Sequence, residues 1–216
     1  MLLTDSRAVP AAWFPDLDGA DVLCLASGGG QQGPLLAAAG ANVTVLDNSP
    51  RQLARDRLVA EREALPLRTV EGDMRNLSEF AEGDFDLVFH PVSNVFCPDL
   101  APVWRESFRV LRPGGTLMSG FMNPDVFIFD MQAMERQELV VVHSIPFDTL
   151  SLPEGERARE FGLENPIEYS HTMTEQLGGQ LAAGFVITGF QEAPHHADAT
   201  ARYLPVYYAT RAVKPS

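Results

Sequence analysis

Apolar runs and amphipathic stretches alternate along the first 121 residues of the chain. Five of the runs are short and almost continuously apolar or β-branched, which predicts buried strands at 21–26, 42–47, 67–71, 86–90 and 116–121. Helical stretches fill intervals between them and predict helices at 34–39, 50–63 and 102–111. Strands that are apolar on both faces and alternate with helices belong to parallel sheets covered on both sides. The pattern therefore predicts an α/β fold, a Rossmann-like, doubly wound and mostly parallel sheet with helices on both faces.

Capping signals mark the beginning of two helices. Ser49 is a typical N-cap residue, Pro50 suits the first helical position, and Gln52 stands at the spacing of a capping box. Thr172 and Glu175 repeat that spacing further along the chain. A helix is therefore predicted to begin at each of these two places.

The last part of the chain is less regular. Residues 185–192 and 205–212 are β-rich and predict an antiparallel pair, which completes a seven-stranded sheet with an antiparallel C-terminal edge strand. Before the fifth strand, the RPGG stretch at 112–115 predicts a turn. Residues 123–170 read as an insertion, and no composition shift marks a second domain. We therefore interpret 1–216 as a single domain.

Charge and cysteine content narrow the function classes. The chain has 16 basic and 29 acidic residues, a formal net charge of −13, and Lys214 is its single lysine. Nucleic acids and anionic membrane surfaces select clustered Lys and Arg, so neither is expected as a partner. Cys24 and Cys97 are too few for a disulfide framework or a four-cysteine zinc site. With neither a signal-peptide pattern nor an 18-residue apolar run, the sequence predicts a cytoplasmic protein.

A glycine-rich loop follows the first predicted strand. Gly28, Gly30 and Gly33 satisfy G-x-G-x-x-G between a strand and a helix, where backbone can approach a ligand closely. Asp47 ends the second strand, where a carboxylate accepts hydrogen bonds from both hydroxyls of a ribose. The alternative role for Asp47, helix capping, is already filled by Ser49. Loop and carboxylate fit a dinucleotide and S-adenosylmethionine equally well.

The stretches VLCLASGGG, VTVLDNSP, VEGDM, FDLVFHPVSNVF and WRESFRVLRPGG decide between those two cofactors. In this order and spacing, over about residues 22–121, the chain resembles the class I S-adenosylmethionine-dependent methyltransferases, more narrowly their type 11 small-molecule group. The resemblance implies methyl transfer from S-adenosylmethionine to a small-molecule acceptor.

The same resemblance implies a role for individual residues. Ala26, Ser27, Gly28 and Gly30 would line the methionine moiety, and Asp47 would bind the ribose. The remaining implied cofactor contacts are Asn48 beside the adenine, Asp73 on its amino group, Met74 on its ring, and His90 near the sulfonium. A cationic sulfonium also suits an acidic protein better than a pyrophosphate would.

Two departures from the family pattern bear on cofactor affinity. Cys24 stands where the family usually has Asp or Glu, and Ala26 stands where it usually has Gly. Gln31, Gln32 or a backbone carbonyl would then have to hold the ammonium end of the cofactor. Only twenty residues precede the first strand, so Trp13 and Phe14 would form at most a partial lid. We therefore predict weak cofactor binding.

Histidines are the candidate catalytic bases. His90, at the end of the fourth strand, and His171, after Glu168-Tyr169-Ser170, are the two candidates, whereas His143 is interpreted as structural. Ser93 and Asn94 are candidates for orienting a polar group of the substrate. The cluster at 195–198 (HHAD) resembles a metal site only superficially, because no fourth ligand is evident, and no metal is expected.

The insertion is expected to set the acceptor. Its large apolar residues fit three interpretations equally: a pocket wall, the core of a subdomain, or a contact in a homodimer. They are Phe127, Phe129, Met131, Met134, Phe147 and Phe161. Two other functions stay open, an NAD-dependent oxidoreductase that uses the glycine loop and Asp47, and a non-catalytic member of the fold that binds a nucleoside.

Overall fold

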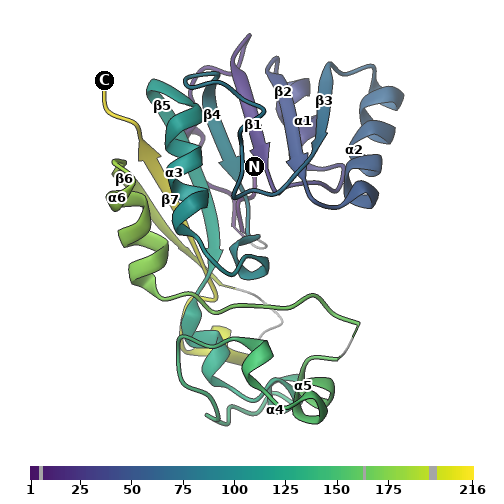
Figure 1. Ribbon diagram of the computed structural model, residues 1–216, viewed down its shortest axis with the longest axis vertical. Coiled ribbons are helices and arrows are strands. Elements are labelled where there is room, and N and C mark those ends of the chain that lie inside the picture. The colour runs from purple at the N-terminus through teal and green to yellow at the C-terminus, as the bar shows by residue number, and fades with distance from the viewer. Residues whose placement is uncertain (5–6, 163, 195–198) are drawn as a thin grey trace.

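The computed structural model describes residues 1–4, 7–162, 164–194 and 199–216. It contains a seven-stranded sheet in the order β3-β2-β1-β4-β5-β7-β6 (Figure 1). The strands are β1 Asp21–Leu25, β2 Asn42–Asp47, β3 Leu67–Glu71, β4 Phe85–His90, β5 Leu111–Met122, β6 Val186–Ala193 and β7 Tyr207–Val213. The first five pair in parallel, whereas β7 is antiparallel to both of its neighbours. The predicted Rossmann-like, mostly parallel fold is confirmed, with β6 outermost and the C-terminal strand β7 next to it.

Helices cover both faces of this sheet, as the sequence predicts. The α-helices are α1 Gln32–Ala38, α2 Pro50–Glu63, α3 Ala101–Val110, α4 Met131–Glu135, α5 Glu154–Glu160 and α6 Gly179–Ala182. Short 3-10 turns are η1 Ala11–Trp13, η2 Asn94–Phe96, η3 Pro124–Ile128, η4 Thr149–Ser151 and η6 Ala199–Arg202, and η5 Thr174–Gly178 is a π-helix. None of the helices in the described ranges is long and apolar enough to cross a bilayer.

Side-chain alternation along β1 shows how the two faces are filled. Leu23 and Leu25 enter one buried cluster with Trp104 of α3, and Val22 and Cys24 enter the other. Leu36 of α1 and Leu53 of α2 also belong to this second cluster. Because successive residues of a strand face opposite sides, a continuously apolar strand supplies both cores at once. Because β1 to β4 are parallel, their carboxyl ends meet at one edge of the sheet.

Both predicted capping signals appear at helix starts. Ser49 Oγ accepts a hydrogen bond from the Gln52 N–H at 3.3 Å, at the beginning of α2. Thr172 and Glu175 form both arms of their capping box before η5. The predicted turn at 112–115 instead forms the irregular first part of β5, where the pairing with β4 shifts register.

The described residues of the segment 123–170, which we call the cap, lie in the lower part of the molecule in Figure 1. Two small apolar clusters hold them, one around Phe129 and Met134 with Val206, and one around Phe127 and Phe147. Most of the large apolar side chains singled out in the sequence are therefore cap core.

Candidate active site

A cavity of about 600 Å³ opens where the parallel strands end. The segments after β1, β2 and β3 supply one side of it, with Ala26, Gly28, Asp47, Asn48, Asp73 and Met74 among its lining residues. The opposite side comes from residues 92, 93 and 96–98 and from residues 166, 167 and 169 of the cap. The structure therefore brings six of the predicted cofactor residues together, in the place where open α/β sheets bind ligands. We call this the strand-end cavity.

Asp47 is a buried polar side chain of this cavity that is anchored by the backbone. It is only 9% exposed, and its two carboxylate oxygens accept hydrogen bonds from the backbone N–H of Gly28 at 2.8 Å and of Ser49 at 2.9 Å. Each oxygen of a carboxylate has two acceptor positions, so both keep capacity for the hydroxyls of a ribose. A Cβ at Gly28 would lie 2.9 Å from Asp47 Oδ2, which explains why glycine is needed there.

A second carboxylate holds the next part of the glycine loop. Asp56, on α2, is fully buried, and it accepts hydrogen bonds from the N–H groups of Gly29 at 2.8 Å and Gly30 at 3.0 Å. Burial raises the pKa of Asp56, the two N–H donors act against that shift, and the charge of Asp47 adds to it. Sequence reasoning missed this residue. The available signal was its place on the buried stripe of α2, between Leu53 and Ala60.

The loop that results suits a cation better than a phosphate. In pyrophosphate sites the loop N–H groups point at the ligand, but here the three consecutive N–H groups of residues 28–30 are bonded to Asp47 and Asp56. Cys24, where the family pattern has a carboxylate, is fully buried, and burial raises the pKa of its thiol to about 12. The negative charge beside the loop therefore comes from Asp47 and Asp56. The cavity fits a nucleoside that carries a positive charge.

Asp73, the predicted contact for the adenine amino group, has a partner in the protein that the sequence analysis did not foresee. Asp73 is bound by Arg75, whose Nε lies 3.1 and 3.0 Å from the two carboxylate oxygens, and this ion pair holds the pKa of Asp73 below its usual range. Met74 packs against the core beside α3 while it lines the cavity, so it offers an apolar surface for a ring. The bond from an adenine amino group to Asp73 stays a prediction.

The two candidate catalytic histidines lie behind the cavity wall. His90 is fully buried; its Nδ1 lies 3.0 Å from the Leu25 carbonyl oxygen and its Nε2 lies 2.6 Å from the Asn94 side-chain oxygen. Burial lowers the pKa of His90. Its ring is absent from the lining that the structure describes, so the geometry gives no support for contact with a sulfonium or an acceptor.

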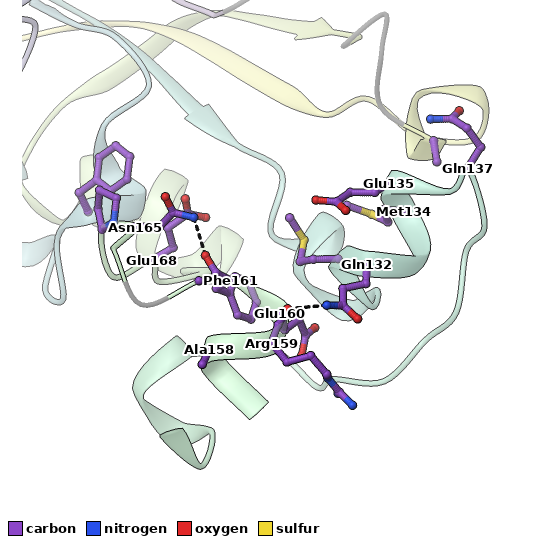
Figure 2. A pocket seen from close by; sticks show the side chains of 15 residues that line it. Gln132, Met134, Glu135, Gln137, Ala158, Arg159, Glu160, Phe161, Asn165 and Glu168 are labelled. Atoms are coloured by element: carbon purple, nitrogen blue, oxygen red, sulfur yellow. Dashed lines mark hydrogen bonds between the residues drawn. The ribbon is translucent and has the colours of Figure 1, made fainter. Parts of the chain in front are cut away.

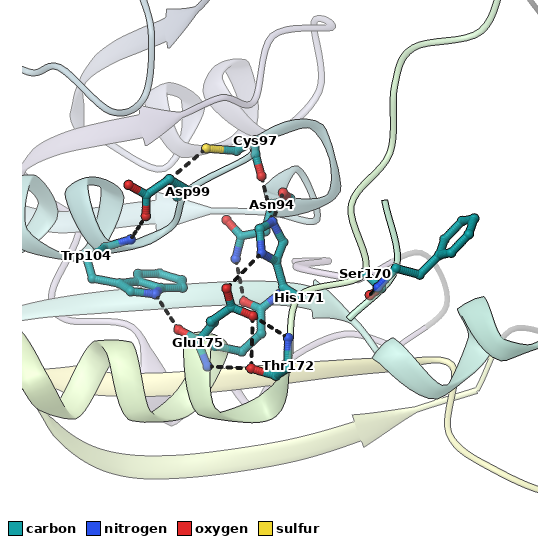
Figure 3. A network of polar contacts seen from close by, with 11 residues as sticks. Asn94, Cys97, Asp99, Trp104, Ser170, His171, Thr172 and Glu175 are labelled. Carbon is teal, nitrogen blue, oxygen red and sulfur yellow. Dashed lines mark hydrogen bonds and ion pairs between the residues drawn. The ribbon is translucent and has the colours of Figure 1, made fainter. Parts of the chain in front are cut away.

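His171 has an equally structural position (Figure 3). It is 4% exposed, and its Nε2 lies 2.6 Å from the Cys97 carbonyl oxygen and 3.1 Å from that of Asn94. Asn94 is itself buried and donates to Gln176 at 2.7 Å. Both histidines thus support the 94–97 segment, which carries part of the cavity wall, and Ser93 lines the cavity beside them.

The remaining residues that were predicted to contact the cofactor do not line the strand-end cavity. Ser27 is buried, the Gly30 N–H is bonded to Asp56, and neither residue belongs to the described lining. Gln31 and Gln32 line a separate, smaller cavity of about 300 Å³ beside residues 2–4.

The prediction that Trp13 and Phe14 form a partial lid over the cofactor is wrong. Phe14 stacks on Phe89, with ring centroids 6.1 Å apart, and Trp13 packs over Gly189 of β6. Neither residue lines the strand-end cavity.

A larger cavity of about 880 Å³ lies inside the cap (Figure 2). Figure 2 shows Met134 and Glu135 extending from α4 toward the segment that carries Asn165 and Glu168, with Phe161 between them. Burial raises the pKa of Glu168. We call this the cap cavity; no single motif in the sequence indicated it, because its walls come from stretches far apart in the chain.

Two side chains line both cavities. Phe96, in η2, and Pro166, in the cap, belong to the strand-end cavity and to the cap cavity alike. Phe96 is 48% exposed although it is a large apolar residue. The two cavities are therefore neighbours that share a wall.

Other predicted polar residues have ordinary explanations. His143 contacts Glu160 at 2.7 Å and stacks on Phe147, which agrees with a structural role. The sequence cluster at 195–198 lies outside the described residues. Within the described part of the chain, no group of three or more His, Cys, Asp or Glu is arranged to hold a metal ion.

Comparison with known proteins agrees with this geometry. Residues 23–119 match the family described as "Methyltransferase domain". The protein named uncharacterized methyltransferase YbaJ in Bacillus subtilis is 48% identical over 213 residues, which is 98% of this chain and 83% of that protein.

Solved structures share the fold at low sequence identity. An S-adenosylmethionine-dependent methyltransferase from Mesorhizobium loti has a TM-score of 0.70 at 19% identity and covers 94% of both chains. The 1,6-didemethyltoxoflavin-N1-methyltransferase of Burkholderia thailandensis has a TM-score of 0.62 at 17% identity and covers 95% of this chain and 79% of its own.

Proposed function

We propose that this chain, which belongs to the type 11 S-adenosylmethionine-dependent methyltransferases, methylates a small molecule bound in the cap cavity. The observation that carries the proposal is the wall shared by the two cavities, made by Phe96 and Pro166. Because Phe96 and Pro166 border both cavities, a methyl donor in one and an acceptor in the other would lie next to each other, and in-line transfer requires that these two side chains leave the passage between them open. The Burkholderia neighbour, named for a small-molecule acceptor, supports the same class.

The strand-end cavity would hold the cofactor through four of its residues. Asp47 would accept from the ribose hydroxyls, Asn48 and Met74 would flank the adenine, and the backbone at Gly28 would approach the methionine portion. When bound, S-adenosylmethionine supplies a methyl group on a good leaving group. The protein's contribution is then largely to hold donor and acceptor in line and to exclude water.

Glu168 is the proposed proton acceptor for a nucleophile in the cap cavity. Its side chain lines that cavity, and burial raises its pKa, which makes the carboxylate a better proton acceptor. His90 and His171 are fully or almost fully buried and have protein partners on their rings, so we assign them to positioning residues 94–97.

The glycine loop argues against a nicotinamide cofactor. Asp47 and Asp56 already bind the N–H groups of residues 28–30, and their two negative charges would repel a pyrophosphate. In the described lining, Arg75 is the basic side chain, and Asp73 binds it.

The proposal is tested by blocking one cavity and leaving the other intact. The wild type is incubated with labelled S-adenosylmethionine and a metabolite extract, and mass spectrometry identifies the small molecule that gains a methyl group. Ala158→Trp fills the cap cavity and should reduce transfer to that molecule at least tenfold, while affinity for S-adenosylhomocysteine stays within twofold.

Glu156→Trp is the matched control, because Glu156 lies on the same helix, is exposed, and is absent from the cavity lining. It should retain both transfer and cofactor affinity. Unchanged transfer by Ala158→Trp would exclude the cap cavity as the acceptor site. Label that enters only macromolecules would exclude a small-molecule acceptor.

A further inference from the structure

Asp56 is a buried carboxylate that neither cavity uses directly. It lies on α2, has no exposed surface, and is absent from the lining of the strand-end cavity. Burying an ionised carboxylate without partners is strongly unfavourable, so its hydrogen bonds identify its role. Those bonds go to Gly29 and Gly30, at 2.8 and 3.0 Å.

The two glycines depend on a partner from outside the loop. Gly29 has a φ of +143° and Gly30 a φ of +77°, values that favour glycine, and neither residue has a side chain with which to fix itself. At Gly30 the backbone also lies close to α2, since a Cβ there would be 3.1 Å from the Arg55 carbonyl oxygen. The Asp56 carboxylate, bound to both N–H groups, therefore fastens the loop to α2.

A change in the conformation of this loop would affect the strand-end cavity through Gly28. Gly28 precedes the fastened pair, lines that cavity, and donates its own N–H to Asp47 at 2.8 Å. A shift of residues 29–30 would move Gly28 relative to Asp47, the proposed ribose ligand. Asp47 and Asp56 thus hold consecutive parts of one loop from two different elements.

We propose that Asp56 is a positioning residue for cofactor binding, which sets the conformation of residues 28–30 and, with Asp47, makes the loop selective for a positively charged nucleoside cofactor over a phosphate-bearing one. The proposal rests on the proposed function for the identity of that cofactor. Because the side chain does not reach the cavity, its effect is transmitted through the backbone of the loop.

Asp56→Asn tests the proposal with little change of shape. The amide keeps one acceptor oxygen but turns a donor toward the second loop N–H, so one hydrogen bond is lost and two donors face each other. Affinity for S-adenosylhomocysteine, measured by titration calorimetry, should fall about tenfold. Hydrogen exchange of the amides at 28–30 should accelerate at least tenfold, while exchange in β6 and β7 stays unchanged.

Glu61→Gln is the matched control, because it removes the same charge from the exposed face of the same helix. It should change neither affinity nor loop exchange. If Asp56→Asn does not fold, Asp56→Glu replaces it; the longer side chain keeps the charge but displaces the carboxylate, and the same two effects are expected.

The outcomes separate this inference from the proposed function. Absence of S-adenosylhomocysteine binding by the wild type would overturn the cofactor assignment, whereas loop exchange would still report on Asp56. Affinity within twofold of wild type, or unchanged exchange at 28–30, would overturn the positioning role. Exchange that accelerates equally throughout the sheet would show a general structural role instead and would also overturn it.

Discussion

The strand-end cavity and the cap cavity are built by different means. The first is lined by strand ends and by a loop whose N–H groups are bound to the buried carboxylates of Asp47 and Asp56. The second is lined by side chains of the short helices α4 and α5 and of the segment 165–168. Backbone geometry therefore fixes the first cavity, whereas side-chain identity fixes the second. This difference suits the proposed roles of the two cavities, cofactor binding in the first and acceptor binding in the second.

The strongest test of this contrast places the same substitution in each region. Gly28→Ala puts a Cβ 2.8 Å from Gln52 Cβ and 2.9 Å from Asp47 Oδ2, so Asp47 must move away from its loop bond. We expect affinity for S-adenosylhomocysteine to fall about a hundredfold, or about 2.7 kcal/mol, by titration calorimetry. Affinity within threefold of wild type would show that the close approach at Gly28 is not required.

Gly155→Ala is the counterpart in the cap, and it should raise the stability of the protein slightly instead of weakening cofactor binding. A Cβ at this position in α5 meets no atom within 4 Å. Because alanine is a better helix former and reduces the freedom of the unfolded chain, stability should rise by about 0.5 kcal/mol in chemical denaturation. Cofactor affinity should not change. A loss of stability would indicate a contact in the cap that the structure does not have.

Glu168→Gln should give the smallest of these effects on stability, and one that depends on pH. Burial raises the pKa of Glu168 above its usual 4.5, so the folded state binds a proton more tightly than the unfolded state. The stabilisation from that proton is complete below the unfolded pKa and is lost as pH rises through the folded pKa. Relative to wild type, the melting temperature of Glu168→Gln should therefore be higher at about pH 7.5 than at about pH 4. A difference that is constant across this range would contradict the burial of the carboxylate.

The fold could be predicted because its signals are local. The apolar run Asp21–Leu25 and its counterparts, three of which lead into a helix, already indicate a covered parallel sheet. The place of Asp47 at the end of β2 could be predicted for the same reason, because the end of a strand follows directly from the apolar pattern. The resemblance of residues 22–121 to a family then supplied the expected cofactor, and the family match confirms it.

The parts that could not be predicted depend on contacts between distant segments. His90 and His171 were candidate catalytic bases from their places in the sequence, but packing with Leu25 and with residues 94–97 buries both rings. Pro166 reaches the strand-end cavity only because the cap folds back over the strand ends. Asp56 was hidden in a helix whose polar residues are mostly exposed, and its partners lie in a loop that precedes it by more than twenty positions.

The central claim is that Asp47 and the strand-end cavity bind S-adenosylmethionine rather than a dinucleotide. The most direct measurement is a parallel calorimetric titration of wild type and Asp47→Ala with S-adenosylhomocysteine and with NADH. Loss of the carboxylate would remove the proposed ribose bonds and the Gly28 anchor together, so we expect wild-type binding of S-adenosylhomocysteine, a decrease of about a hundredfold or more in Asp47→Ala, and no heat from NADH with either protein. Binding of NADH, or equal affinity of the two proteins for S-adenosylhomocysteine, would contradict the account.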